Sequence, residues 1–301
     1  MISFIYYFQT HTTEFLIVST LLGLIVGSFL NVVILRLPVI MERNWRHQCS
    51  RLLRQTHLKT FIDPSGSPET IEEEPFNLVV PRSRCTNCAH ILSVFENIPV
   101  ISYLLLRGRC SACHASISPR YPLIELLSGI MAGGIAWQFG FSTYTAGALL
   151  FTWALIALAF IDLDHQQLPD EITLPFLWIG LTFNLFGVYA SIEDSIIGAI
   201  FGYGILWTVY QSFRLSTGKA GMGYGDFKLL AMVGAWLGWQ ALPATILISS
   251  TIGAMVGITM ILLRGHDRNI PIPFGPYIAI AAWISLLWGP DITEWYLRIW
   301  A

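Results

Sequence analysis

Long apolar runs without a single acidic or basic residue dominate the chain. They occupy the ranges 15–35, 126–161, 172–192, 195–213, 229–263 and 269–290. A transmembrane helix needs roughly 20 apolar residues, so two of these runs are too long for one helix. Polar or glycine-containing stretches at 138–145 and 238–243 divide those two runs. The pattern therefore predicts an all-α polytopic membrane protein with about eight transmembrane helices.

One sizeable polar segment, residues 36–120, lies between the first and second predicted spans. It carries 11 of the 17 Lys and Arg residues. Because basic residues gather in cytoplasmic loops, we expect this segment in the cytoplasm. Eight alternating spans would place 16 of the 17 basic residues on that side, with both termini outside. The predicted regions are 1–35 with the first helix, the cytoplasmic segment 36–120, and a seven-helix membrane domain over 121–301.

Composition supports the membrane assignment and excludes a soluble enzyme. Of the 301 residues, 54% are hydrophobic and 12% are charged, about half the charged fraction of a soluble domain. The mean hydropathy is +0.60. The net charge of -2 gives no reason to expect a nucleic-acid partner. Residues 1–11 lack the basic start of a cleavable signal peptide, so we expect the first apolar run to remain as an anchor.

Four cysteines in the polar segment have the spacing of a zinc ribbon. Cys85 and Cys88 form one C-x-x-C pair, and Cys110 and Cys113 form a second, with 21 residues between the two pairs. A reducing cytosol disfavours disulfides, although redox-active dithiols remain an alternative. Four thiolates would fill a tetrahedral zinc sphere and leave no position for a reactive water, so we expect a structural Zn²⁺. Cys49 belongs to neither pair.

Carboxylates at the ends of the spans are candidates for chemistry, because ionisable groups are costly in a membrane. Asp162 and Asp164 end the third predicted span, and Asp226 opens the sixth. The topology puts all three on the cytoplasmic side. Two carboxylates that share a site can hold one proton between them and activate a water, as in aspartic proteases. No serine, cysteine or zinc-protease motif competes with this interpretation.

Each carboxylate also has a purely structural interpretation. Asp170 follows a proline and precedes the fourth span, so it is predicted to be a helix N-cap. Asp226 would also suit the positive end of a helix, although the glycines at 221, 223 and 225 favour a close backbone approach. Glu125, one turn into the second span, would pair with Arg120 or another interfacial base, or take part in a site.

Taken together, the motifs resemble those of the prepilin peptidase family, which are membrane aspartic proteases of the G-x-G-D type. The similarity runs along nearly the whole chain and includes both C-x-x-C pairs. The other matching motifs lie at residues 27–38, 96–99, 120–125, 162–170, 223–228 and 273–276.

The resemblance implies a catalytic pair, Asp162 and Asp226, with Asp164 and Asp170 as the alternatives. It implies a bacterial inner-membrane enzyme whose active site faces the cytoplasm. The substrates would be type IV prepilins and type II secretion pseudopilins, cut after a glycine that ends a basic leader. Members with the cysteine segment then methylate the new N-terminal residue with S-adenosylmethionine. The candidate residues for that cofactor lie between the two cysteine pairs and are Glu96, Asn97 and Pro99.

The chain departs from the family pattern in a longer polar insert around residues 45–76, to which no role is assigned. Two other protein classes remain as alternatives. A transporter would place ionisable groups near the midplane rather than at span ends. A structural component of a secretion or pilus assembly machine would need no pair of carboxylates.

Overall fold

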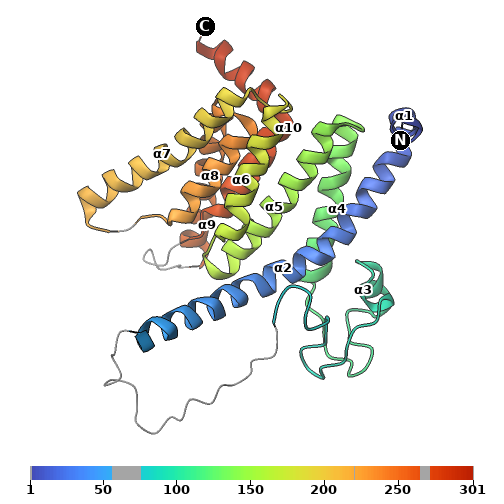
Figure 1. Ribbon diagram of the computed structural model, residues 1–301. Helices are drawn as coiled ribbons and strands as arrows, with labels where there is room; N and C mark the ends of the chain where they lie inside the picture. Colours follow the sequence, from blue (N-terminus) through green and yellow to red (C-terminus); the bar gives the residue numbers. More distant parts are fainter. Residues whose placement is uncertain (1, 56–75, 220, 265–271, 301) are drawn as a thin grey trace. The chain divides into compact units, whose positions relative to one another are not determined.

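Figure 1 shows the computed structural model of the protein, which describes residues 2–55, 76–219, 221–264 and 272–300. Among these residues the regular structure is helical, and the β-type pairing consists of two isolated bridges. The chain forms two compact units. We call Met1–Gly27 with Leu126–Ala301 the membrane unit, and Ser28–Glu125 the cysteine unit. The functional boundaries at residues 35 and 120 remain a prediction.

Every apolar run that was predicted to span the membrane contains a helix, and both predicted breaks are present. A short helix, α1 (Ile2–Thr10), precedes them. The long helices are α2 (Thr12–Gln55), α4 (Arg120–Phe139), α5 (Thr143–His165), α6 (Asp170–Leu185), α7 (Ile192–Thr217), α8 (Tyr224–Leu237), α9 (Leu242–Arg264) and α10 (Gly275–Trp300). A 3₁₀ turn, η2 (Trp239–Ala241), separates α8 from α9. The chain is therefore an all-α polytopic membrane protein.

The helices differ in whether each alone is long enough to cross a bilayer. In the described part of the chain, α2, α4, α5, α7 and the segment from η2 through α9 are long and apolar enough to do so. Helices α6 and α8 have 16 and 14 residues, and the apolar part of α10 is Gly275–Gly289. The polar insert begins as a continuation of α2 to Gln55, and residues 56–75 lie outside the described residues.

Helix α8 is packed tightly against α7 by small residues. A Cβ atom on Gly198 of α7 would lie 2.4 Å from the carbonyl oxygen of Gly234, and one on Gly202 would lie 2.5 Å from that of Leu230. These contacts are possible only for glycine. Gly198 and Gly202 are four residues apart, so both lie on one face of α7. The G-x-x-x-G pair therefore sets the distance between α7 and α8.

A buried asparagine on α6 fixes the far end of α8. The Nδ2 atom of Asn184 lies 2.7 Å from Ser195 Oγ, 3.0 Å from the Ala235 carbonyl oxygen and 2.8 Å from that of Trp236. The indole N–H of Trp236 in turn donates to the carbonyl oxygen of Phe176 at 2.8 Å. Since a buried amide is costly unless its groups are bonded, this network holds α6, α7 and α8 in one arrangement.

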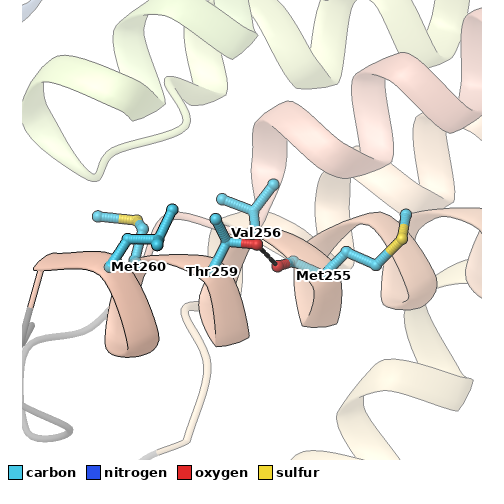
Figure 2. Close-up of a pocket in the computed structure, with 5 residues that line it drawn as sticks. Met255, Val256, Thr259 and Met260 are labelled. Atoms are coloured by element: carbon cyan, nitrogen blue, oxygen red, sulfur yellow. Dashed lines mark hydrogen bonds between the residues drawn. The ribbon is translucent and has the colours of Figure 1, made fainter.

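Helix α9 has an apolar surface with no ionisable group in the hollow drawn in Figure 2. The hydroxyl of Thr259 donates to the carbonyl oxygen of Met255 at 2.7 Å, within the same helix. Val256 and Met260, which are also labelled in Figure 2, add apolar side chains to this surface. A polar group satisfied by its own helix suits contact with lipid. This face therefore offers nothing for catalysis.

In the cysteine unit, a short 3₁₀ turn and a short helix lie between the two cysteine pairs. They are η1 (Phe95–Asn97) and α3 (Ile101–Leu105). The side-chain amide of Asn31 on α2 donates to the carbonyl oxygen of Tyr121 at the start of α4, at 3.1 Å. This bond joins the two helices that flank the cysteine segment.

Candidate active site and metal site

Asp162 lies in the last turn of α5 and is buried, with 5% of its surface exposed. The helix ends after His165 because Gln166 adopts a left-handed conformation and donates its N–H to the Asp162 carbonyl oxygen at 2.9 Å. The side-chain Oδ2 of Asp162 accepts the backbone N–H of Gly275 at 3.0 Å. Gly275 is the first residue of α10, so the carboxylate faces the positive end of that helix.

Asp226 is the third residue of α8 and is also buried, with 7% of its surface exposed. Its Oδ2 accepts the backbone N–H of Gly223 at 3.3 Å, the residue that precedes the helix. Asp226 therefore has the structural role that was predicted as the alternative, because it lies at the positive end of a helix. It is compatible with a second role, because this bond uses one oxygen of the carboxylate.

The fold brings Asp162 and Asp226 close enough to interact electrostatically. Leu168, from the connection between α5 and α6, lies beside Gly225, which precedes Asp226, and beside Gly275, which donates to Asp162. A Cβ atom on Gly225 would lie 2.8 Å from Leu168 Cβ, and a Cβ atom on Gly275 would lie 3.2 Å from Leu168 Cδ2. The same Cβ atom on Gly275 would lie 2.7 Å from Asp162 Oδ2. Glycine is therefore required where α8 and α10 approach these carboxylates.

The predicted N-cap role of Asp170 is wrong. Helix α6 begins at Asp170 itself, and its N-cap is Pro169, which has no side chain able to cap. The Asp170 carboxylate instead binds Lys228 of α8, whose Nζ lies 2.7 Å from each carboxylate oxygen. This attraction between elements distant in sequence outweighs the local capping preference. Asp164 is exposed on α5.

Glu125 lies in the cysteine unit and accepts a hydrogen bond from the backbone, a contact that was not predicted. It is buried, and its Oε2 accepts the backbone N–H of Val100 at 2.8 Å, with a further hydrogen bond from the side chain of Ser28. Val100 has φ +58°, which a β-branched residue rarely adopts. Glu125 therefore holds the strained start of α3.

The four cysteines of the two C-x-x-C pairs converge, with their sulfur atoms all within 4.8 Å of one another. The Sγ atoms of Cys85 and Cys113 are 3.8 Å apart, and those of Cys88 and Cys110 are 4.0 Å apart. A tetrahedral zinc site with bonds of about 2.3 Å has sulfur atoms roughly 3.8 Å from one another. The residues present therefore fit one zinc ion.

The two cysteine pairs are built on the same backbone pattern, 25 residues apart. Cys85 donates its N–H to the His90 carbonyl oxygen, and Cys110 donates to that of Ala115, each at 2.9 Å. Ala89 and His114 have φ values of +56° and +57°, and each donates back to the first cysteine of its pair. An isolated bridge closes each turn. This repeated turn directs both sulfurs of a pair to one point.

The thiol environments favour a bound cation. Hydrogen bonds led by the backbone N–H of Ala115 lower the pKa of Cys113 to about 6. The N–H of His90 favours the thiolate of Cys88, but desolvation and the neighbouring sulfurs outweigh it and raise that pKa to about 12. Four sulfurs at this distance repel as thiolates, so a divalent cation would allow all four to ionise.

The three residues predicted as cofactor candidates lie together in the cysteine unit. Glu96 and Asn97 form most of η1 and line a cavity within this unit, whereas Pro99 is not among its lining residues. Glu96 is held by the N–H of Ser93 at 2.7 Å and by the hydroxyl of Ser111. The hydrogen bond from Ser111, followed by those from Ser93, holds the pKa of Glu96 at about 2.

Two features of the aspartate site were not predicted from the sequence. The first is the backbone N–H of Gly275, which no side-chain pattern reveals. The second is the pair formed by Lys228 and Asp170. Both residues lie in short motifs at the ends of apolar runs, but their pairing depends on how α6 and α8 pack.

Comparisons with known proteins agree over most of the chain. Residues 21–139 match the bacterial peptidase A24 N-terminal domain, and residues 149–258 match the type IV leader peptidase family. Relatives named prepilin leader peptidase/N-methyltransferase are 52% identical in Stutzerimonas stutzeri over 97% of both chains, and 54% identical in Aeromonas hydrophila over 92% of both. A relative of the same name in Neisseria gonorrhoeae is 46% identical over 93% of both chains. No solved structure matches the chain. The chain belongs to the type IV leader peptidase family.

Proposed function

We propose that this protein is a bifunctional membrane enzyme. It cleaves the basic leader from type IV prepilins and type II secretion pseudopilins after a glycine, and then methylates the new N-terminal residue. The names of relatives about half identical over nearly the full chain support both activities. Membership of a peptidase family favours this function over a transporter or a structural component of an assembly machine.

The peptidase activity is assigned to Asp162 and Asp226. One carboxylate accepts a proton from water, while the other, protonated, donates to the oxygen of the scissile carbonyl. The water oxygen bonds to the carbonyl carbon, the C–N bond breaks, and the leaving amine takes up a proton. The observation that carries this proposal is the burial of the two carboxylates in electrostatic contact.

Neighbouring groups in the site would hold the pair in position. The N–H groups of Gly275 and Gly223 each bind one carboxylate oxygen, which leaves the other oxygen of each carboxylate for water or substrate. The Lys228 and Asp170 pair links the start of α6 to α8 two residues after Asp226. These contacts limit the rotation of both carboxylates and so lower the cost of orienting them for reaction.

Two cofactors complete the proposal. Cys85, Cys88, Cys110 and Cys113 would hold a structural Zn²⁺, which would stabilise a polar segment that has little apolar core of its own. S-adenosylmethionine would supply the methyl group to the free amine and leave as the thioether. The cysteine unit is the part of the chain that contains the candidates Glu96 and Asn97.

The proposed location is the bacterial inner membrane, with several spans and an active site that faces the cytoplasm. Most Lys and Arg residues lie in the segment 36–120 and in the loops 212–228 and 264–271, which the predicted topology puts on the same side as the aspartates, and this supports the orientation. The substrate's apolar stem would lie among the helices, and its basic leader would remain at the cytoplasmic surface.

Leader removal by purified variants tests the peptidase assignment. Asp162→Asn and Asp226→Asn keep the size and hydrogen-bond acceptor of each side chain but remove the carboxylate, so we expect no detectable cleavage of a purified prepilin. Asp164→Asn is the matched control, because Asp164 lies two residues from Asp162 and is exposed. Normal cleavage by either of the first two variants, or its loss in the control alone, would refute the assignment.

A further inference from the structure

A cavity of about 530 Å³ lies within the cysteine unit. Its walls come from one face of α2, both cysteine turns, the turn η1 and the first residues of α4. All the residues that line it belong to Ser28–Glu125, so the cavity is a feature of this unit alone. Its volume is within the roughly 300–1,000 Å³ of ligand sites.

One side of the cavity carries a fixed negative charge. Glu96 is held by Ser93 and Ser111, and with a pKa of about 2 it is ionised at neutral pH. Asn97 lies next to it in the same turn and also lines the cavity. A charge held in place by two neighbours costs little further ordering when a cation binds beside it.

The wall formed by α2 carries the opposite charge. Arg36 lines the cavity, and its guanidinium is positioned by donation to the carbonyl oxygen of Asn77 at 3.1 Å. The ring of Phe76 lies 5.8 Å from the guanidinium carbon. An arginine oriented in this way is suited to bind a carboxylate, because its planar group presents several donors.

Aromatic and hydroxyl groups also line the cavity, among aliphatic side chains. Tyr103 and Tyr121 offer flat surfaces with a hydroxyl, and Ser102, Ser116 and Ser118 offer further donors and acceptors. Aromatic faces stack on planar nitrogenous rings, while hydroxyls bond to their edges and to sugar hydroxyls. The cavity therefore presents both charges, stacking surfaces and hydrogen-bonding groups around one volume.

We infer that this cavity binds S-adenosylmethionine, with Glu96 facing its cationic amino or sulfonium group, Arg36 its carboxylate, and the tyrosines its adenosine. This inference rests on the proposed methyl transfer. The other candidate occupant, the N-terminus of the cleaved substrate, has one cationic amine followed by apolar side chains. With that peptide bound, Arg36 would gain no carboxylate beyond its bond to the Asn77 carbonyl oxygen, and most of the hydroxyls would gain no bond to the ligand.

A bound metal would also help to form the cavity. Cys85 and Cys110, one from each pair, line the cavity. The metal would therefore hold the two cysteine turns that form one wall. Glu125 supports another wall, because it binds the N–H of Val100 just after the turn that carries Glu96.

Binding of labelled S-adenosylmethionine to the full-length protein in detergent tests the inference directly. Glu96→Gln removes the charge but retains an acceptor for the Ser93 N–H. We expect its dissociation constant to rise by roughly tenfold or more, the loss of one charge-assisted contact. Its zinc content and its cleavage of prepilin should match those of the wild type.

The matched control is Glu42→Gln, which removes the same charge from an exposed position on α2. Glu42 pairs with Arg46 at the surface and does not line the cavity. We expect this variant to bind the labelled compound as tightly as the wild type. Equal binding by Glu96→Gln and the wild type would overturn the inference, as would equal weakening by both variants.

Photo-crosslinking of the wild type locates the site without any substitution. Ultraviolet irradiation with the labelled compound, followed by peptide mapping, should place the label within residues 28–125. Label within residues 126–300 would overturn the inference and leave the proposed methyl transfer intact. If the wild type binds no S-adenosylmethionine and does not methylate, the proposed methyl transfer fails as well, while cleavage of prepilin reports separately on the peptidase.

Discussion

The narrow space around Asp162 makes Gly275→Ala an informative substitution. The added Cβ would lie 2.7 Å from Asp162 Oδ2 and 3.1 Å from its Cγ, about 0.7 Å closer to the oxygen than the 3.4 Å at which ordinary contact begins. The carboxylate must therefore move, and the bond from the Gly275 N–H, now 3.0 Å, would lengthen or break. Overpacking of this kind costs about 1–3 kcal/mol.

We expect Gly275→Ala to slow leader removal strongly in a protein that remains folded. A displacement approaching 1 Å in a catalytic group costs about 100-fold in rate, or about 2.7 kcal/mol in the barrier. The assay is single-turnover cleavage of a purified prepilin, with the product resolved by mass spectrometry and thermal unfolding measured in the same detergent.

Gly204→Ala is the control for Gly275→Ala, because its Cβ would meet nothing within 4 Å. It should cleave at the wild-type rate. A cleavage rate for Gly275→Ala within threefold of the wild type would refute the reasoning, since it would show that Asp162 tolerates this displacement or has no part in the reaction.

Three other substitutions test the remaining contacts. Lys228→Met removes the partly exposed pair with Asp170, so we expect a loss of at most about 1 kcal/mol and a cleavage rate no more than fivefold lower; abolished cleavage would mean that Lys228 has a direct role. Cys110→Ser should reduce bound zinc, measured by metal analysis, from one ion per chain to nearly none, whereas Cys49→Ser should leave it unchanged; equal zinc in both would contradict the four-cysteine site. Gly198→Leu should lower the unfolding temperature, because its Cβ would lie 2.4 Å from the Gly234 carbonyl oxygen. An unchanged unfolding temperature would show that α7 and α8 can separate without cost.

Local patterns along the chain predicted the helices well, because burial in lipid leaves a strong signal. A helix that crosses a membrane must satisfy its own backbone and avoid charge, so each span is a long run without acids or bases. The breaks at 138–145 and 238–243 could be identified for the same reason, since a turn needs polar or glycine residues. The spacing of the cysteines predicted their cluster because each C-x-x-C turn is built within a few residues.

The expectations that failed concern partners that are distant in the chain. Asp170 has the local context of an N-cap, yet it binds Lys228 on another helix. Glu125 was expected to pair with a base or to take part in a site. Its Oε2 instead accepts the N–H of Val100, and it lines the cavity of the cysteine unit, so a site role stays a prediction. The glycines before Asp226 were expected to permit close approach. This holds for Gly221 beside Phe213 and for Gly225 beside Leu168, whereas a Cβ on Gly223 would meet its nearest atom at 3.6 Å, an ordinary contact.

The membrane class, the helices, the cysteine cluster and the two aspartates as candidates all follow from the amino-acid sequence alone. These features depend on hydrophobic burial and on short motifs, both of which act over a few residues to a few turns. Three other features became visible only in the folded protein: Gly275 donates to Asp162, Leu168 lies beside Gly225 and Gly275, and Glu96 and Arg36 line one cavity. Such contacts join groups far apart in the chain, and their geometry depends on how closely the helices and turns pack.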